Sequence, residues 1–290
     1  MIKEIKAKTL VSRVKGIDTY FGLDYGMNLY RGCQHRCIYC DSRSECYGIE
    51  QFDRDVLIKA NAVELLRKEL GRKRRKGIIG TGSMNDPYMP LEASVKLTQR
   101  ALEVIAEQMF GVHIVTKSDL VVRDIPILKK IARVGAAVSL SITTSDDLLA
   151  RKVEPHSPPP SARFRALKQL AAHGIETRVA LMPTLPFIED SWDNVSGIVE
   201  RAQECGVKTI VPWFGMSMRD RQRSYYYARL DELFPGLRTR YEAAYGNAYS
   251  CPSPNAKPLS DWFAALCASH GIATSARPHL APTAEQIPLA

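Results

Sequence analysis

The chain has 290 residues, 45% hydrophobic and 24% charged, which is typical of a globular protein and enough for one large α/β domain. The N-terminal residues carry charges and no apolar run approaches the ~20 residues that span a membrane, so we expect a cytoplasmic protein with no secretory signal and no membrane partner. The net charge of +9 favours an anionic partner such as nucleic acid without identifying one.

Short β-like runs alternate with longer helical patterns through most of the chain. The expected strands, rich in Val, Ile and Thr, are residues 27–30, 77–80, 113–116, 137–143, 177–182 and 209–213. The expected helices between them are residues 56–70, 94–108, 125–133, 161–173 and 191–205. Six β/α units in series predict an α/β fold, a partial (β/α)6 TIM-type barrel with its active site at the carboxyl ends of the strands.

The segments that flank this barrel have a different pattern. We expect residues 1–24 to form an N-terminal extension, 25–216 the barrel, and 217–290 a small C-terminal helical region with a loosely ordered proline-rich tail. Two basic runs, residues 72–76 and 219–223, are each either a solvated surface or an anion-binding one. The tyrosines at 225–227 could stack on nucleic-acid bases, but three adjacent positions of a helix point in different directions, so at least one should be core.

Three of the seven cysteines, Cys33, Cys37 and Cys40, lie within eight residues directly after the first expected strand. Thiolates at this spacing can bind three irons of a [4Fe-4S] cluster and leave the fourth iron open for a substrate or cofactor. The alternative is a zinc site completed by His35 or by a distant ligand, but structural zinc prefers paired cysteine knuckles and only one is evident here. The other four cysteines are scattered and do not suggest a second cluster: Cys46, Cys205, Cys251 and Cys267.

This cysteine loop and several later segments resemble the radical S-adenosylmethionine (SAM) superfamily, and within it the branch that is similar to spore photoproduct lyase. The matching segments are residues 30–41, 85–92, 116–118, 123–124, 139–144, 154–155, 160, 163 and 181–186. The resemblance implies a [4Fe-4S] cluster that cleaves SAM to a 5'-deoxyadenosyl radical, which then abstracts hydrogen from an organic substrate. It also implies an external electron donor of the flavodoxin or ferredoxin type, and we expect a monomer.

Polar residues at the strand ends are the candidates for binding SAM. Ser139, Ser141 and Thr143 alternate along one strand and share a face, so their hydroxyls could bond the ribose or the carboxylate of SAM. The resemblance assigns SAM binding to Lys117 and Ser141. It transfers only a backbone role to residues 80–82, where many relatives have a glutamate. The full set of cofactor-binding candidates is Tyr39, Gly80, Thr81, Gly82, Lys117, Ser139, Ser141, Thr143, Glu154, Arg163 and Met182.

Two members of this set, Glu154 and Arg163, could equally form a structural pair or a pair that orients SAM.

Departures from the lyase pattern concern the substrate. The lyases carry a tyrosine after the third cluster cysteine, where this chain has Asp41, and a hydrogen-donating cysteine after the second strand, where residues 80–86 contain none. Cys46 is a candidate catalytic thiol in its place, although a free cysteine is more often a small buried apolar side chain.

The substrate is therefore left open. The resemblance supports the cofactor and the fold better than photoproduct repair, so nucleic acid, a peptide and a small metabolite are all candidate substrates. A different class of function also stays open at this point, namely a zinc- or Fe–S-containing module that binds nucleic acid or transfers electrons without catalysis.

Overall fold

A central sheet of seven strands organises the fold in the computed structural model, which describes residues 1–52 and 54–275. Its order is β10-β9-β8-β7-β6-β3-β2, and every neighbouring pair is parallel except β2 with β3. The strands are β2 (Val11–Arg13), β3 (Tyr25–Met27), β6 (Ile78–Thr81), β7 (Gly111–Thr116), β8 (Ala136–Ser141), β9 (Glu176–Leu181) and β10 (Thr209–Pro212). The six parallel strands and the two open edges confirm the predicted partial barrel.

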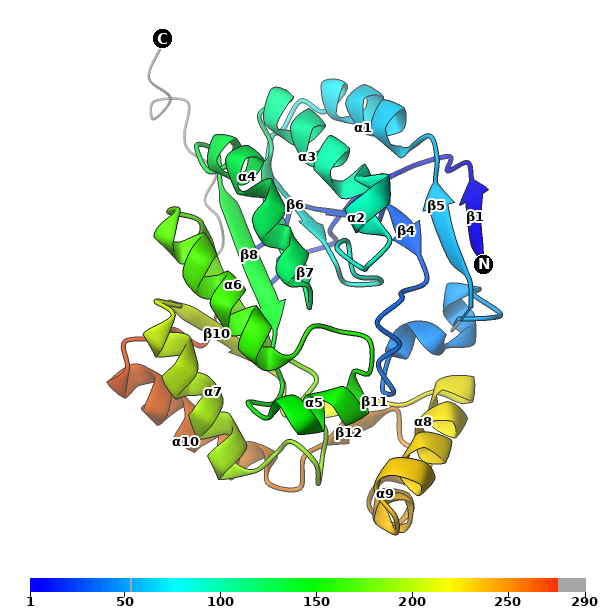
Figure 1. Cartoon of the computed structure of the whole chain (residues 1–290), viewed down its shortest axis with the longest axis vertical. Helices are drawn as coiled ribbons and strands as arrows, with labels where there is room; N and C mark the ends of the chain where they lie inside the picture. The colour runs from blue at the N-terminus through cyan, green and yellow to red at the C-terminus, as the bar shows by residue number, and fades with distance from the viewer. Residues whose placement is uncertain (53, 276–290) are drawn as a thin grey trace.

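Helices cover the outer side of this sheet (Figure 1). They are α1 (Ala62–Gly71), α2 (Glu92–Val95), α3 (Leu97–Glu107), α4 (Ile125–Ile131), α5 (Asp147–Val153), α6 (Pro160–Ala172) and α7 (Trp192–Glu204). All six residues of β8 are buried, as expected for a central parallel strand with both faces covered. Helix α6 begins with a proline in its first turn and is followed by Gly174 at φ +74, two features that set the ends of a helix in the sequence.

Two of the expected helices were wrong in part. Residues 56–59 form the strand β5 (Val56–Lys59), which pairs with β1 (Ile2–Ile5) and β4 (Tyr30–Arg31) in a second, three-stranded sheet. A four-residue alternation of buried and half-buried positions is too short to distinguish from the first turn of the helix that follows it. The expected helix 94–108 is two helices, because Lys96 between α2 and α3 has φ +52.

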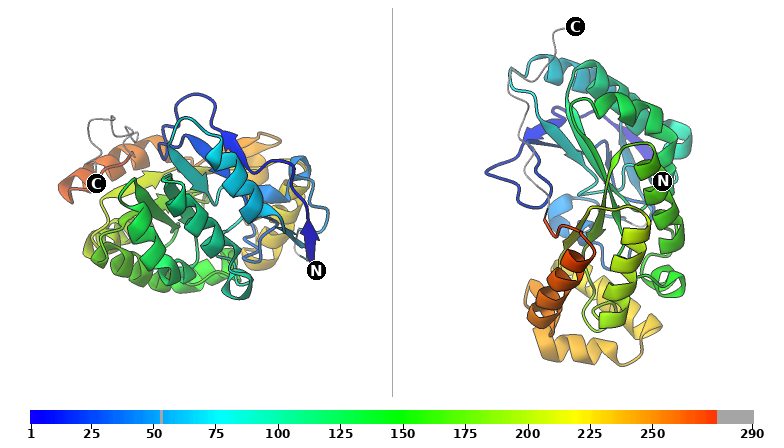
Figure 2. Two further views of the ribbon diagram at one scale, coloured as in Figure 1. Left: turned by 90° about the horizontal axis from the view of Figure 1, so that it is seen from above. Right: turned by 90° about the vertical axis from the view of Figure 1, so that its left-hand side faces the viewer.

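Residues 1–24 run along one edge of the large sheet, and the loop after β2 lies on the side away from the helices α3 to α6 (Figure 2). The strand β1 belongs to the small sheet and β2 extends the large one. Between β2 and β3 the chain enters the concave side, where the Phe21 ring stacks on His113 of β7 with centroids 4.6 Å apart. This segment therefore forms one wall of the barrel interior.

The C-terminal region is built from α8 (Asp220–Leu233), α9 (Leu237–Tyr245), α10 (Ala256–Ser269) and a two-stranded antiparallel sheet of β11 (Gly215–Ser217) with β12 (Ser250–Pro252). A second apolar core joins α8 and α9 to the cysteine loop, and it contains Ile38, Met218 and Tyr226. The proline-rich tail predicted to be loosely ordered lies, from residue 276 onward, outside the described residues. Within the described part, no helix combines the length and the apolar character needed to cross a bilayer.

Candidate active site

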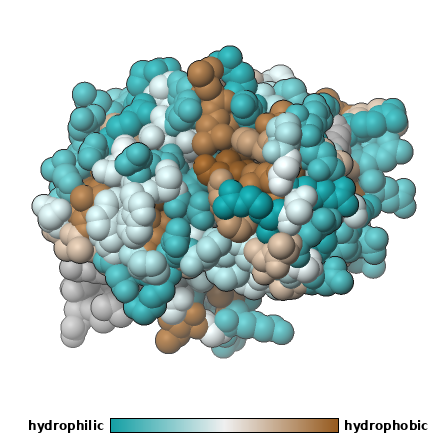
Figure 3. Space-filling view, turned by 90° about the horizontal axis from the view of Figure 1, so that it is seen from below, coloured by the Kyte–Doolittle hydropathy of each residue, from teal (hydrophilic) through white to brown (hydrophobic). Residues whose placement is uncertain are grey.

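A cavity of about 490 Å³ lies at the carboxyl ends of the parallel strands, and we call it the cysteine cavity. Cys33, Cys37 and Cys40 all line it, together with residues from the ends of β6, β7, β8 and β9. Figure 3 looks from below at the end of the molecule toward which the β8 arrow points in Figure 1, and it shows apolar surface gathered near the middle, between hydrophilic flanks.

Backbone contacts hold the cysteine loop in its shape. Gly32 precedes the first cysteine at φ +83, and a Cβ at this position would lie 2.4 Å from the carbonyl oxygen of Asp55, so only glycine fits without a shift. The Ile38 N–H donates to the carbonyl of Val153 at 2.9 Å. On the other side, the Gln222 side-chain amide donates to the carbonyl of Tyr39 at 3.0 Å. The loop is therefore fixed from both the barrel and the C-terminal region.

The three thiols are close enough to influence one another. Burial raises the pKa of Cys33 well above its usual value, and the neighbouring Asp86, Cys37 and Cys40 raise it further. Burial also raises the pKa of Cys37 to about 12, although Lys117 acts in the opposite direction. Thiols of this kind are weak nucleophiles at neutral pH, whereas a bound metal deprotonates them outright. The cavity thus fits a metal centre better than a catalytic thiol.

A single metal ion does not fit the same residues as well. Among the described residues, no three His, Cys, Asp or Glu side chains converge to hold one ion. A [4Fe-4S] cluster does not need such convergence, because each thiolate binds a different iron. His35 is also committed elsewhere, since its Nε2 lies 3.0 Å from Asp86 Oδ2 and its Nδ1 lies 3.1 Å from the His156 carbonyl. Both ring nitrogens of His35, one of the two possible fourth zinc ligands considered from the sequence, therefore have other neighbours.

Asp86 connects the cysteine loop to the end of β7. It accepts hydrogen bonds from the Thr116 hydroxyl at 2.6 Å and from the Lys117 N–H at 2.7 Å. Burial opposes ionisation of this carboxyl, but His35 and these donors outweigh burial and lower its pKa to about 2. Asp86 lies in one of the matching segments, but the sequence alone gave no indication that it contacts His35.

Four residues from separate segments form a buried network beside the cysteines. Glu154 accepts hydrogen bonds from the Tyr39 hydroxyl and from the Arg163 guanidinium, and Lys117 Nζ lies 3.7 Å from its Oε1. Burial alone would raise the pKa of Glu154, but Arg163 and Lys117 hold it below its usual value. Arg163 also donates to the Ser141 carbonyl at 2.7 Å, which ties the pair to the end of β8. Glu154 and Arg163 are thus a pair, and Lys117 reaches from this pair to the cavity.

The predicted cofactor-binding residues divide into two groups by position. Those that line the cysteine cavity are Tyr39, Gly80, Thr81, Gly82, Lys117, Ser141 and Met182. Gly82 has φ +103, and a Cβ there would lie 1.8 Å from the Val115 carbonyl, so the chain can lie this close to β7 only because this residue is glycine. The roles of these residues toward a cofactor stay predictions.

The others lie behind the cavity wall. Ser139 is fully buried and its hydroxyl lies 2.7 Å from His113 Nε2. Thr143 donates to Glu189 at 2.8 Å. Cys46 is exposed, lies 3.5 Å from the Ser44 hydroxyl, and lines a neighbouring cavity instead. Of the three alternating hydroxyls, only that of Ser141 belongs to a residue that lines the cysteine cavity.

Asp41, the departure from the lyase pattern, anchors the cysteine loop to the C-terminal region. Its carboxylate forms an ion pair with Arg219 at 3.1 Å and accepts hydrogen bonds from the Tyr47 hydroxyl at 2.9 Å and from the Ser217 hydroxyl at 3.2 Å. This network lies directly beside Cys40. A tyrosine at position 41 could not form the ion pair with Arg219 that the aspartate forms.

Most of the described side chains of the arginine and tyrosine segment, residues 219–227, pack or form hydrogen bonds within the protein. Tyr226 and Tyr227 are buried in the second core, as expected for at least one of the three tyrosines. Arg221 donates to the carbonyls of Arg43 and Ile49, and Arg223 donates to three further carbonyls. The other basic run, residues 72–76, precedes β6 and so lies at the amino ends of the strands, opposite the cysteine cavity.

Glu189 is a buried acid that the sequence patterns did not indicate. It accepts hydrogen bonds from Thr143 and from the Leu185 N–H at 2.9 Å. Burial raises its pKa to about 8, and the negative charge of Glu154 acts in the same direction. A carboxyl group in this state holds a proton at neutral pH.

This shift predicts a pH dependence of stability. The unfolded chain ionises Glu189 near pH 4.5 and the folded protein only near pH 8, so the free energy of unfolding falls as pH rises between these values. Glu189→Gln removes this dependence, and we expect the variant to gain up to about 4 kcal/mol relative to the native protein between pH 5 and pH 8.5. Urea unfolding of the metal-free proteins at several pH values measures it, and two parallel pH profiles would contradict it.

Comparison with known proteins gives a consistent picture of sequence and fold. The sequence profile described as the Radical SAM superfamily matches residues 27–195. An uncharacterized protein of Mycobacterium tuberculosis is 30% identical over 261 residues, which cover 88% of this chain and 76% of that protein. An uncharacterized protein of Methanocaldococcus jannaschii is 35% identical over 191 residues, covering 65% of this chain and 70% of the relative.

Solved structures extend the comparison to the fold. A spore photoproduct lyase complexed with dinucleoside spore photoproduct superimposes with a TM-score of 0.70 at 13% identity, covering 94% of this chain and 81% of the lyase. A radical S-adenosylmethionine methyltransferase from Kitasatospora setae, with tryptophan and a SAM analog bound, gives a TM-score of 0.53 at 11% identity, covering 87% and 52%. At these identities the comparison establishes the fold alone, and it confirms the predicted likeness to the lyase at that level.

Proposed function

Because the chain belongs to the radical SAM superfamily and is an enzyme, we propose that it cleaves SAM reductively and uses the resulting radical to abstract hydrogen from an organic substrate. The observation that carries this proposal is the cysteine cavity, where three buried thiols and the predicted SAM-binding residues line one space. Membership of an enzyme superfamily sets aside the non-catalytic zinc or Fe–S module.

The cysteines would hold a [4Fe-4S] cluster, which supplies the electron for cleavage of the SAM sulfonium bond when both are bound. Lys117 would bind the SAM carboxylate, because Lys117 lines the cavity and its ion-pair partner Glu154 is already paired with Arg163. Burial opposes its charge, but Glu154 raises the pKa of Lys117 above its usual value, so it stays cationic. Gly82 lines the same cavity, where its backbone groups would contact SAM.

The remaining roles follow from the same placement. Ser141 and Met182 line the cavity beside Lys117 and could contact the ribose and adenine parts of SAM. The network of Tyr39, Glu154 and Arg163 would hold Lys117 and the cysteine loop in fixed positions relative to each other. We further propose that a monomer receives its electron from a flavodoxin or ferredoxin type donor. Nucleic acid is the substrate class that the net charge of +9 favours, and a peptide or small metabolite is the alternative.

Anaerobic reconstitution with iron and sulfide tests the proposal. The reconstituted protein should bind SAM and form 5'-deoxyadenosine when dithionite is added. A protein loaded with four irons and four sulfides that forms none under any reducing condition contradicts the proposed reaction, as does purification with one zinc and no sulfide.

The Lys117→Met variant of the same preparation tests the assigned cation. We expect SAM to bind the loaded variant about 10-fold or more weakly, because a charge-assisted hydrogen bond is lost, while iron content is unchanged. Lys129→Met, an exposed lysine on α4, is the matched control and should bind SAM like the native protein. Equal affinity in both variants would place the SAM carboxylate elsewhere.

A further inference from the structure

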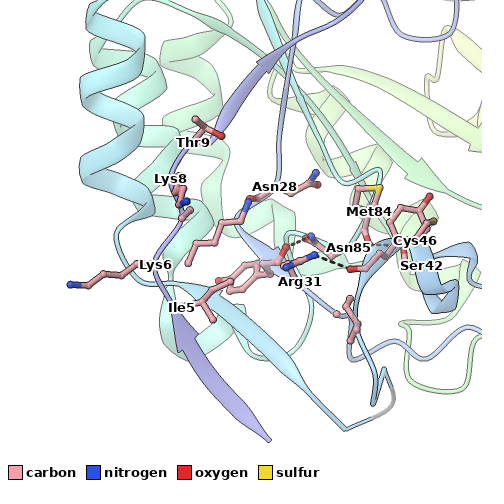
Figure 4. Close-up of a pocket in the computed structure, with 16 residues that line it drawn as sticks. Ile5, Lys6, Lys8, Thr9, Asn28, Arg31, Ser42, Cys46, Met84 and Asn85 are labelled. Carbon is pink, nitrogen blue, oxygen red and sulfur yellow. Dashed lines mark hydrogen bonds between the residues drawn. The ribbon is translucent and has the colours of Figure 1, made fainter.

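A second cavity of about 380 Å³ lies behind the cysteine loop, and we call it the basic cavity (Figure 4). Its lining comes from residues 5–9 after β1, from 28–32 around β4, from the end of β5 and from the loop after the cysteines. Four residues, Ser42, Tyr47, Met84 and Asn85, line both this cavity and the cysteine cavity. The two spaces are therefore separated by a single layer of side chains.

The lining is positively charged. Its described residues include Lys6, Lys8, Arg31 and Lys59 and no Asp or Glu. Among the described residues, none of these four cations forms an ion pair, although ion pairs are frequent elsewhere on the surface. Figure 4 shows Arg31 toward the centre of the lining residues, whereas the Lys6 side chain extends away from them. An uncompensated group of cations in a concave site is the arrangement that binds anions.

Arg31 and Lys59 carry most of this argument. Lys59 Nζ donates to the Asn28 carbonyl at 2.6 Å, and Arg31 Nη2 donates to the Tyr47 carbonyl at 2.9 Å, which holds both head groups in place but leaves most of their donors free. Burial lowers the pKa of Lys59, and the positive charge of Arg31 lowers it further against the smaller opposite effect of Glu69, so the two cations are near enough to repel each other. An anion between them would remove that repulsion.

Unpaired amide groups give a second, independent indication of a ligand. Asn85 is only 6% exposed, and while its Nδ2 donates to the Tyr30 carbonyl at 2.6 Å, its Oδ1 has no partner. The buried Oδ1 of Asn28, on the same lining, also has none. Buried polar atoms are normally paired, and both of these unpaired atoms are acceptors, so a ligand that also brings a donor fits this wall. A phosphate group has acceptor oxygens for the cations, and as a monoester it can also carry an O–H donor.

We propose that the basic cavity binds a phosphate group through Arg31 and Lys59, and that this group belongs to the substrate whose reacting part enters the cysteine cavity. The phosphate belongs to a small phosphorylated compound, whose monoester can carry that O–H donor, and a nucleic-acid backbone, whose phosphodiesters cannot, is the alternative that the experiment tests. Only the assignment to the substrate rests on the proposed function, because the phosphate site itself needs no cluster, no SAM and no reductant.

The test is phosphate binding by the full-length protein without reductant, measured by titration calorimetry. Inorganic phosphate and uridine 5'-phosphate should bind and uridine should not. Arg31→Gln and Lys59→Gln should each weaken phosphate binding about 10-fold or more. Lys130→Gln removes the same charge from an exposed site on α4 and should leave binding unchanged. Circular dichroism checks that each variant is folded, and if Arg31→Gln is not, Lys59→Gln decides.

The source of the phosphate is distinguished by competition with short single-stranded DNA. Displacement of inorganic phosphate by DNA at concentrations well below those needed for uridine 5'-phosphate supports a nucleic-acid backbone, and equal affinities support a small compound. The proposal is overturned if the native protein binds no phosphate, or if Lys130→Gln weakens binding as much as Lys59→Gln. It is also overturned if Lys59→Gln changes only the rate of cluster reduction by an acidic flavodoxin, since the cavity would then serve the electron donor.

Discussion

Replacing Cys37 with alanine should reduce both iron content and 5'-deoxyadenosine formation to background. Cys37 is buried in the cysteine cavity between the apolar residues of the second core and the charged network of Lys117 and Glu154. No other cysteine of the described chain lines this cavity except Cys33 and Cys40, so no nearby thiol can replace the lost ligand. A cluster with two protein thiolates exposes a second iron and is expected to be lost during reconstitution.

Cys46→Ala is the matched control. Cys46 lies only six residues from Cys40, but it is exposed and does not line the cysteine cavity. The variant should load the same iron and sulfide as the native protein and should still cleave SAM. Iron retention by Cys37→Ala together with loss from Cys46→Ala would show that the ligand set is wrong. A change in substrate product alone in Cys46→Ala would support Cys46 as the catalytic thiol.

Glu154→Gln should lower the free energy of unfolding by about 3–5 kcal/mol. The side chains of Glu154 and Arg163 are each about 1% exposed, so the substitution leaves a buried guanidinium without its negative partner. The Tyr39 hydroxyl and Lys117 lose the same negatively charged partner, and both belong to the predicted SAM site. Urea unfolding of the metal-free protein measures the effect without interference from the cofactor.

Two further variants separate this buried pair from an ordinary charge effect. Glu242→Gln makes the same substitution in the exposed pair of Glu242 with Arg238, and it should change stability by no more than about 1 kcal/mol. Combining Glu154→Leu with Arg163→Met removes both buried charges and should recover much of the lost stability but not SAM binding. Similar losses from the buried and the exposed substitution would contradict the network described here.

The order of the parallel strands and the location of the cysteine loop could be read from local patterns. Apolar runs with β-branched residues recur between helical segments, and neighbouring β/α units connect in only one hand, so the barrel follows from the chain order. The region that misled the prediction was β5, whose pairing partners β1 and β4 lie far away in the chain. A strand of four residues has too few positions for its own periodicity to identify it.

The sequence by itself determined the cysteine loop, because three thiols within eight residues need no distant segment to form a metal-binding site. It also determined the open barrel that positions the loop. Only the tertiary structure decided which polar residues reach the cavity, since Tyr39, Lys117, Glu154 and Arg163 come from separate segments and meet through packing. The basic cavity depends even more on the tertiary structure, because its cations at positions 6, 8, 31 and 59 form no basic run in the sequence. Charges so far apart along the chain come together only when the fold places their strands side by side.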